Sequence, residues 1–140
     1  MSRKTAREDA FKLIFSSSLN KEECADILDT FFEEKNRDGE AFAKADKGDA
    51  EYIRATLEGV SSHKEEIESK ISENLKGWKL ERLSRVSVAV LKLAVYEMLY
   101  SEDVPASVAI NEAVKIAQKY EDEKAGSFVN GVLGSIEKKR

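Results

Sequence analysis

The sequence contains few of the residues that bind metals or form disulfides. Cys24 is its only cysteine and His63 its only histidine. A single thiol excludes an intrachain disulfide, and these two residues are too few for a cysteine–histidine zinc cluster. We expect Cys24 to be a buried thiol on an apolar helix face and His63 to be exposed at a helix start. We therefore expect no metal and no other cofactor.

Helix-breaking residues are also scarce. Pro105 is the only proline, and there are seven glycines among 140 residues. Hydrophobic residues make up 41% and charged residues 36%, which allows both a core and a solvated surface. A chain of this length suits one domain. The sequence therefore predicts an all-α protein with a single domain over residues 1–140.

Long hydrophobic runs are absent. The most apolar stretch, Val86–Leu99, is interrupted by Ser87, Lys92 and Glu97. It is shorter than the roughly 20 residues that cross a bilayer. The N-terminus also lacks the apolar segment and the small-residue cleavage site of a secretory signal. We expect a cytoplasmic protein that does not bind a membrane.

No catalytic motif is recognisable. The sequence has neither a GxGxxG pattern nor a P-loop, which bind dinucleotides and triphosphates. Acidic pairs such as Glu65–Glu66 and Glu121–Asp122 fall on polar faces and loops, where solvation explains them. A Ser–His–Asp arrangement would depend on His63 alone. We expect that the chain is not an enzyme.

The net charge of −4 disfavours a surface that coats nucleic acid in general, because counterion release requires clustered cations. Any nucleic-acid site must therefore be local. Two basic clusters stand out: Arg3, Lys4 and Arg7 near the front, and residues 138–140 at the end. We interpret the rear cluster as a solubilising tail.

Apolar residues recur at helical spacing in about seven segments. Thr5 and Glu8 have the spacing of a capping box at the start of the first helix. The predicted helices begin near Thr5, Asn20, Ala50, Ser62, Leu80, Ser107 and Ser127, with loops at 36–49 and 121–126. The segment from Leu80 to Tyr100 is apolar all round, so we expect a central, buried helix there.

Three residues inside the predicted helices call for a structural reason. A glycine within a helix costs about 1 kcal/mol relative to alanine, so Gly131 predicts a close approach to another helix. Asn111 and Asn130 lie among apolar residues. We expect their amides to be buried and to satisfy backbone groups where helices meet.

The front cluster combines charge with aromatic surface. On a helical wheel Lys4, Arg7, Phe11 and Phe15 form one stripe, separate from the apolar stripe of the same helix. Cations can pair with phosphates and aromatic rings can stack on unpaired bases. Short basic N-termini are nevertheless common, and the rings can instead belong to the core. The residues alone leave both interpretations open.

Four segments together resemble the NusB transcription antitermination family. They read DVPASVAINEAVKIAQKY at 103–120, FVNGVL at 128–133, SRKTARE at 2–8 and VLKLAVYEML at 90–99, with Trp78 at the preceding junction. The resemblance implies two helical bundles packed across each other. It also implies binding of boxA RNA together with NusE, a 30S ribosomal protein. Such a complex helps RNA polymerase to read through terminators in ribosomal RNA operons.

The resemblance also implies which residues contact RNA. Arg3, Lys4 and Arg7 match the basic motif of the family, and Phe15 matches an aromatic position that follows it. We therefore expect that replacing the three cations by alanine weakens binding of boxA RNA sharply without changing thermal stability.

A second RNA segment and a partner surface are implied by the same resemblance. Phe128 falls near the RNA surface, although its spacing also suits the core, and Ser127 stands where many relatives have a basic residue. Lys124 is then the only nearby cation of that loop. Glu81 and Ser87 align with the surface that meets NusE, with Ser87 in place of a common acidic residue.

Two other functions fit the sequence. One is a helical adaptor or homodimer that acts through protein partners only. The other is a detached relative of the NusB-like domain that precedes RNA cytosine methyltransferase domains, although the chain shows no cofactor-binding region. The residues leave open whether the free protein is a monomer or a homodimer, and which RNA it prefers.

Overall fold

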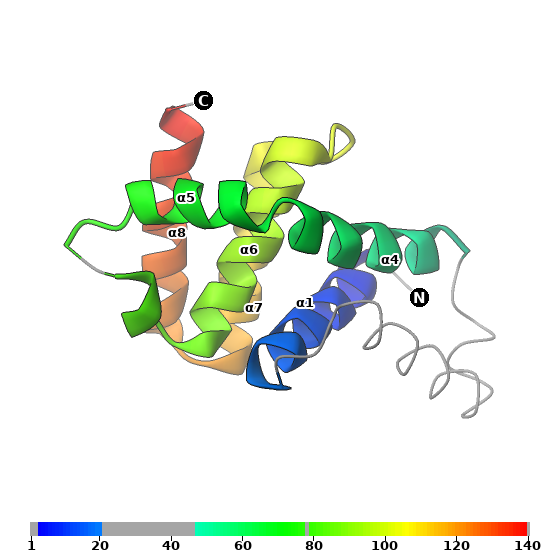
Figure 1. Cartoon of the computed structure of the whole chain (residues 1–140), viewed down its shortest axis with the longest axis horizontal. Helices are drawn as coiled ribbons and strands as arrows, with labels where there is room; N and C mark the ends of the chain where they lie inside the picture. The colour runs from blue at the N-terminus through cyan, green and yellow to red at the C-terminus, as the bar shows by residue number, and fades with distance from the viewer. Residues whose placement is uncertain (1–2, 21–46, 78, 140) are drawn as a thin grey trace. The chain divides into compact units, whose positions relative to one another are not determined.

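The computed structural model describes residues 3–20, 47–77 and 79–139. Within these ranges it has six α-helices, one 3-10 helix and no strand, which confirms the predicted all-α class (Figure 1). The chain divides into two compact units, residues 1–61 and 62–140. The helix predicted from Asn20, with Cys24, and most of the predicted loop 36–49 lie outside the described residues. The single domain over 1–140 stays a prediction.

Two helices supply the described part of the first unit. They are α1 (Arg3–Asn20) and α4 (Lys47–Ser62), and both begin earlier than predicted. Thr5 therefore lies inside α1 rather than at its start, because Arg3 and Lys4 favour helix as well. The apolar stripe predicted for each helix is buried: Ala6, Ala10, Leu13 and Ile14 in α1, and Ile53, Leu57 and Val60 in α4.

The second unit is a group of helices around α6 (Arg85–Tyr100). α7 (Ala106–Tyr120) and α8 (Glu123–Lys138) pack beside α6, and α5 (Lys64–Glu73) crosses them (Figure 1). As predicted, α6 is central, with buried residues all round it: Ala89, Val90, Leu91, Leu93, Ala94, Val95 and Met98. An ion pair of 3.3 Å between Lys92 Nζ and Glu68 Oε1 joins α6 to α5.

The start of α6 differs from the prediction. Residues 80–82 form the short 3-10 helix η1 (Leu80–Arg82), and α6 itself begins only after Ser84. The Ser84 hydroxyl accepts a hydrogen bond of 3.1 Å from the Ser87 backbone N–H. A serine cap of this kind satisfies an amide that the first helical turn leaves unpaired. The apolar pattern did not reveal this interruption because Leu80 and Leu83 continue it.

The caps of α7 and α8 also differ from the prediction. Pro105 precedes α7 instead of Ser107, a place where its missing N–H costs no hydrogen bond. Asp122 caps α8 instead of Ser127, and its carboxylate accepts a hydrogen bond of 2.8 Å from the Ala125 N–H. The expected loop 121–126 was therefore wrong, since most of it is the first turn of α8. A carboxylate is also favoured there by the positive end of the helix dipole.

The close helix approach in α8 occurs at Gly126, not at Gly131. A Cβ on Gly126 would lie 2.6 Å from Gln118 Cγ of α7, whereas a Cβ on Gly131 would meet no described atom within 4 Å apart from its chain neighbours and the backbone of its own helix. The prediction for Gly131 was therefore wrong. Sequence spacing placed the contact in the right helix but on the wrong face.

The buried asparagine of the second unit is Asn74, not Asn111 or Asn130, which are both exposed. Asn74 follows the last residue of α5 and donates from Nδ2 to the Lys70 carbonyl oxygen at 2.8 Å. Its Oδ1 accepts a hydrogen bond of 2.6 Å from the Ser135 hydroxyl of α8. α5 therefore ends before Gly77, which has a φ of 79° and stands in the following turn.

Candidate nucleic-acid interface

The first turn of α1 carries positive charge and no acidic residue. Arg3 opens the helix and Lys4 follows it with an exposed side chain. Backbone N–H groups at a helix start are unpaired within the helix and carry a partial positive charge. Phosphate groups therefore bind well at such a position, and the two cations strengthen that preference.

Arg7 belongs to the predicted basic motif but is buried. Its side chain is only 5% exposed, and its guanidinium carbon lies 5.9 Å from the centre of the Tyr52 ring in α4. Both residues belong to the first unit. Burial leaves little guanidinium surface for a phosphate, so direct RNA contact by Arg7 stays a prediction. The expectation that the triple alanine variant keeps its thermal stability no longer holds, since a buried side chain contributes to packing.

The two phenylalanines of the α1 stripe differ in exposure. Phe11 is 2% exposed and belongs to the core, whereas Phe15 is half-buried. Their ring centres are 6.2 Å apart, with 33° between the ring planes. The separate stripe seen on the helical wheel is thus mostly a second buried face of α1. Phe15 alone keeps aromatic surface with which a base could stack.

The first two turns of α8 carry the second predicted RNA segment. Lys124 and Ser127 are exposed, and Phe128 is half-buried. Residues three and four positions apart share a helix face, so these three side chains form one patch. The buried Ala125 and Val129 lie on the opposite side of the helix. We call the three side chains the α8 patch. It belongs to the second unit, whereas α1 belongs to the first.

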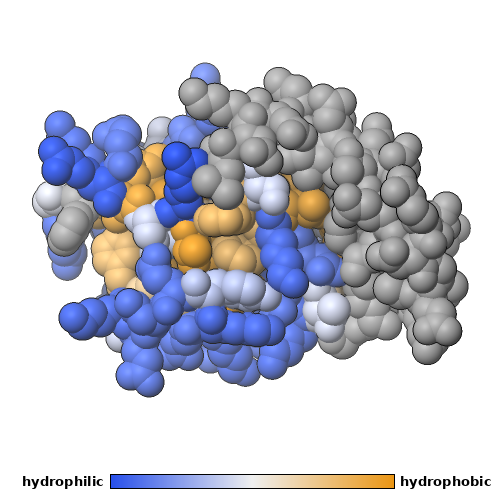
Figure 2. All heavy atoms as spheres, turned by 90° about the horizontal axis from the view of Figure 1, so that it is seen from below, coloured by the Kyte–Doolittle hydropathy of each residue, from blue (hydrophilic) through white to orange (hydrophobic). Residues whose placement is uncertain are grey.

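The predicted partner surface is only partly exposed. Glu81 in η1 is exposed, but Ser87 is 4% exposed in the first turn of α6. A partner contact through the Ser87 side chain stays a prediction, and its burial disfavours it. Leu80 and Leu83 beside Glu81 are half-exposed. Figure 2 shows apolar surface among hydrophilic residues on the face seen from below.

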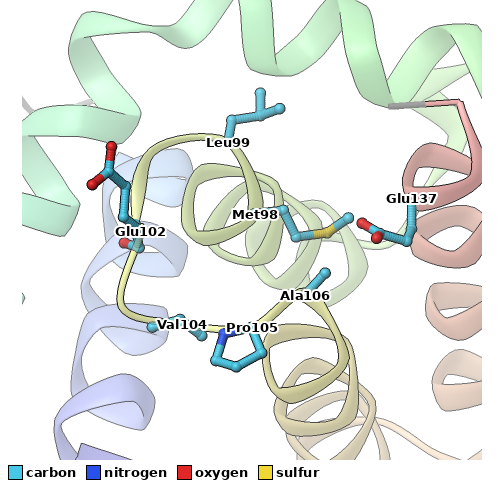
Figure 3. Close-up of a pocket in the computed structure, with 8 residues that line it drawn as sticks. Met98, Leu99, Glu102, Val104, Pro105, Ala106 and Glu137 are labelled. Carbon is cyan, nitrogen blue, oxygen red and sulfur yellow. The ribbon is translucent and has the colours of Figure 1, made fainter.

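A pocket of about 480 Å³ opens where α6 ends, α7 begins and α8 ends (Figure 3). Met98 and Glu137 point toward each other across it, with Ala106 below. Its charged lining residues are the carboxylates Glu102 and Glu137, which repel phosphate, and it contains none of the predicted RNA residues. Among the described residues no cluster of acidic, histidine or cysteine side chains is suited to a metal ion.

His63 lies in an aromatic row rather than standing alone in solvent. Its ring stacks on that of Tyr100 with centres 4.1 Å apart, and Tyr100 in turn stacks on Tyr96 at 5.7 Å. The Tyr100 hydroxyl also donates to Glu66, which raises the pKa of Tyr100 to about 12. Burial, followed by the charge of Glu97, raises the pKa of Tyr96. The expected exposed histidine is thus half-buried and holds the start of α5 against the end of α6.

Two of the contacts that the sequence analysis missed differ in how visible they were in the sequence. The stacking of Tyr96 on Tyr100 had a signal, because residues four positions apart on a helix are neighbours. The approach of Arg7 to Tyr52 had none, since these residues are far apart in sequence and nothing in either helix pattern links them.

No helix among the described residues is long and apolar enough to span a membrane.

The sequence and the structure were compared with known proteins. Residues 4–138 match the NusB family. A transcription antitermination protein NusB of Clostridium botulinum strain Alaska E43 is 44% identical over 139 residues, which cover 99% of this chain and 100% of that protein. The NusB of Clostridium novyi is 42% identical over 136 residues, or 97% of this chain and 98% of that protein.

Solved structures give the same result. NusB of T. maritima superposes with a TM-score of 0.88 at 35% identity, covering 100% of this chain and 93% of that one. A chain from a crystal structure of the antitermination factors NusB and NusE in complex with double-stranded RNA superposes with a TM-score of 0.85 at 33% identity. The match covers 99% of this chain and 97% of that one. The predicted NusB-like fold is therefore confirmed, and the chain belongs to the NusB family.

Proposed function

We propose that the chain is a transcription antitermination factor that works in the cytoplasm, binds boxA-type single-stranded RNA and performs no catalysis. Its relatives at 44% and 42% identity are named transcription antitermination protein NusB. In this proposal it joins NusE and RNA polymerase and promotes read-through in ribosomal RNA operons. The structure of NusB and NusE with double-stranded RNA, whose NusB chain is 33% identical, supports NusE and RNA as partners.

The basic first turn of α1 is the observation that carries the proposal. Arg3 and the exposed Lys4 lie at the positive end of α1, and the same turn contains no carboxylate. Such contacts hold the phosphate backbone, and stacking on aromatic rings then favours unpaired bases. In the proposal Phe15 adds a ring to the α1 site of the first unit, and the α8 patch of the second unit is a separate RNA contact through Lys124 and Phe128. Arg7 belongs to the same basic motif as Arg3 and Lys4 and is buried.

The surface around Glu81 is proposed to meet NusE. η1 presents the exposed carboxylate of Glu81 beside the half-exposed Leu80 and Leu83. A polar rim around apolar residues is the usual composition of a protein interface. Ser87 lies next to this surface and, being buried, would act by shaping the start of α6.

The proposal is tested by titrating labelled single-stranded boxA RNA with the full chain, alone and with NusE. An unrelated strand and a duplex of equal length serve as reference RNAs, and light scattering follows the mass of each species. We expect boxA RNA to bind more tightly than both references, and more tightly again with NusE. Equal binding of all three RNAs would contradict the proposal.

A pair of matched variants tests the proposed site. We expect the double change Arg3→Ala and Lys4→Ala to weaken binding at least tenfold, as expected for two lost charge-assisted contacts. The control is the double change Lys138→Ala and Lys139→Ala, which removes the same charge from two exposed cations at the end of the chain. Equal losses in the two variants would show that net charge, not the α1 turn, governs binding.

A further inference from the structure

The third cation of the basic motif, Arg7, lies against an aromatic ring of its own unit. The Arg7 guanidinium carbon is 5.9 Å from the centre of the Tyr52 ring, within the range of a cation–π contact. Arg7 is on α1 and Tyr52 on α4, and both belong to the first unit. The contact therefore links the two described helices of that unit.

The low exposure of Arg7 and the partial burial of Tyr52 indicate a packing contact rather than a phosphate site. Arg7 is 5% exposed, and Tyr52 is half-buried. A phosphate contact would need the guanidinium to leave the ring and reach solvent, which would also uncover its buried stem. Lys4, one turn earlier, is already exposed and needs no such rearrangement.

We propose that Arg7 is a positioning residue for RNA binding rather than a phosphate ligand. By holding α1 against Tyr52 of α4, it fixes the direction of the turn that carries Arg3 and Lys4. This inference rests on the proposed RNA-binding function. It assigns separate roles within one motif: the first two cations contact RNA, and the third orients them.

The residue type at position 7 agrees with this role. Arginine has a planar guanidinium that is more weakly hydrated than an ammonium group and stacks on aromatic faces. Lysine can also bind phosphate as a point charge, but its ammonium group stacks less well on a ring when buried. Thus, burial against a ring explains why arginine suits position 7.

Salt dependence distinguishes the two roles. The slope of log affinity against log salt concentration counts the phosphates that a protein neutralises, at about 0.7 per contact on single strands. The experiment measures this slope and the affinity for single-stranded boxA RNA in the full chain. The variants are Arg7→Gln, Tyr52→Leu, their combination, and Lys4→Gln as the reference for a direct contact.

We expect Arg7→Gln and Tyr52→Leu each to weaken binding by about two- to thirtyfold, the range of one cation–π contact, with the salt slope unchanged. The combined variant should lose less affinity than the sum of the two single losses, because both remove the same contact. Lys4→Gln should lower the slope by about 0.7. Tyr52→Phe keeps the ring and should bind like the unaltered chain, even if Tyr52→Leu fails to fold.

Other outcomes overturn the inference. A slope that falls by about 0.7 in Arg7→Gln would make Arg7 a phosphate ligand. Unchanged RNA binding in a folded Tyr52→Leu variant, or weakened RNA binding in Tyr52→Phe, would show that the Tyr52 ring does not act by holding Arg7. If the unaltered chain did not bind RNA, the proposed function would fail and this inference with it. If the unaltered chain binds RNA but Arg7→Gln lowers the salt slope, the proposed function stands and only the positioning role of Arg7 is overturned.

Discussion

The starts of α1 and α8 are both proposed to meet RNA, yet their charges are arranged in opposite ways. The first turn of α1 contains Arg3 and Lys4 and no acidic residue. α8 begins with the Asp122 cap and has Glu123 in its first turn, beside Lys124. Cations at a helix N-terminus destabilise it and anions stabilise it, by about 0.3–1 kcal/mol each. α1 thus begins against the preference of its own helix, and α8 begins in agreement with it.

Because of this difference, we expect the two helix starts to have different roles. A turn that keeps unfavourable cations is suited to an anion from outside, such as an RNA phosphate. A turn with its own carboxylates has already satisfied that preference from within. We therefore expect RNA affinity to depend mainly on the start of α1, and helix stability to depend more on the start of α8.

The largest expected effect concerns the aromatic residues of the two helices. Phe11→Ala should lower the free energy of unfolding by about 3–5 kcal/mol, because Phe11 is a core residue with 2% exposure. Phe128→Ala should cost less than half of that, since Phe128 is half-buried. Denaturant unfolding followed by circular dichroism measures both. Similar losses would show that Phe128 is as structural as Phe11, and would weaken its proposed RNA role.

The next effect concerns the cap of α8. Asp122→Ala should destabilise the protein by about 1 kcal/mol, since it removes the hydrogen bond of 2.8 Å to the Ala125 N–H. Asp122→Asn is the matched control, because it keeps an oxygen that can accept the bond and should lose less. Thermal unfolding can compare the two. A loss in RNA affinity as large as that of the α1 variants would break the division between the helices.

A smaller effect concerns the glycines of α8. Gly131→Ala should stabilise the protein by about 0.5–1 kcal/mol, because alanine favours helix and the new Cβ would meet no described atom of another helix within 4 Å. Gly126→Ala should gain less, since its Cβ would lie 2.6 Å from Gln118 Cγ and displace that side chain. Denaturation midpoints measure the difference. An equal gain at both positions would show that Gln118 moves away without cost.

The fold could be predicted from the sequence because helix periodicity is a local property. The central position of α6 follows from its apolar pattern, and the end of α7 at Tyr120 from the charged stretch that comes next. Helix starts were less accurate because several polar residues could serve as caps. Ser107 and Ser127 fit the capping rule in sequence, yet Pro105 and Asp122 hold those positions.

The candidate site was predictable as a set of residues but not as a surface. The motif that contains Lys4 and Arg7 was recognised in the sequence, although a helical wheel cannot show which of its stripes faces a neighbouring helix. Burial of Arg7 and Phe11 depends on packing between segments far apart in the chain. For the same reason Asn111 and Asn130, expected in the core, are exposed, and Asn74 joins α5 to α8 instead.

The smallest expected change in stability has the greatest power to test the comparison between the two helix starts. Lys4→Glu should stabilise the folded protein by about 0.3–1 kcal/mol, because it replaces a cation by an anion at the positive end of α1. The same change should weaken RNA binding strongly, since it places a carboxylate where a phosphate is proposed to bind.

Lys124→Glu makes the same charge change in the first turn of α8 and is the matched control. It should give a smaller gain in stability, because Asp122 and Glu123 already place carboxylates there, and a smaller loss in RNA affinity. A gain in stability together with a loss in RNA affinity in Lys4→Glu would show that Lys4 lowers the stability of α1 and favours RNA binding. If Lys4→Glu destabilised the protein, the exposed lysine would have a structural role, and the contrast between α1 and α8 would fail.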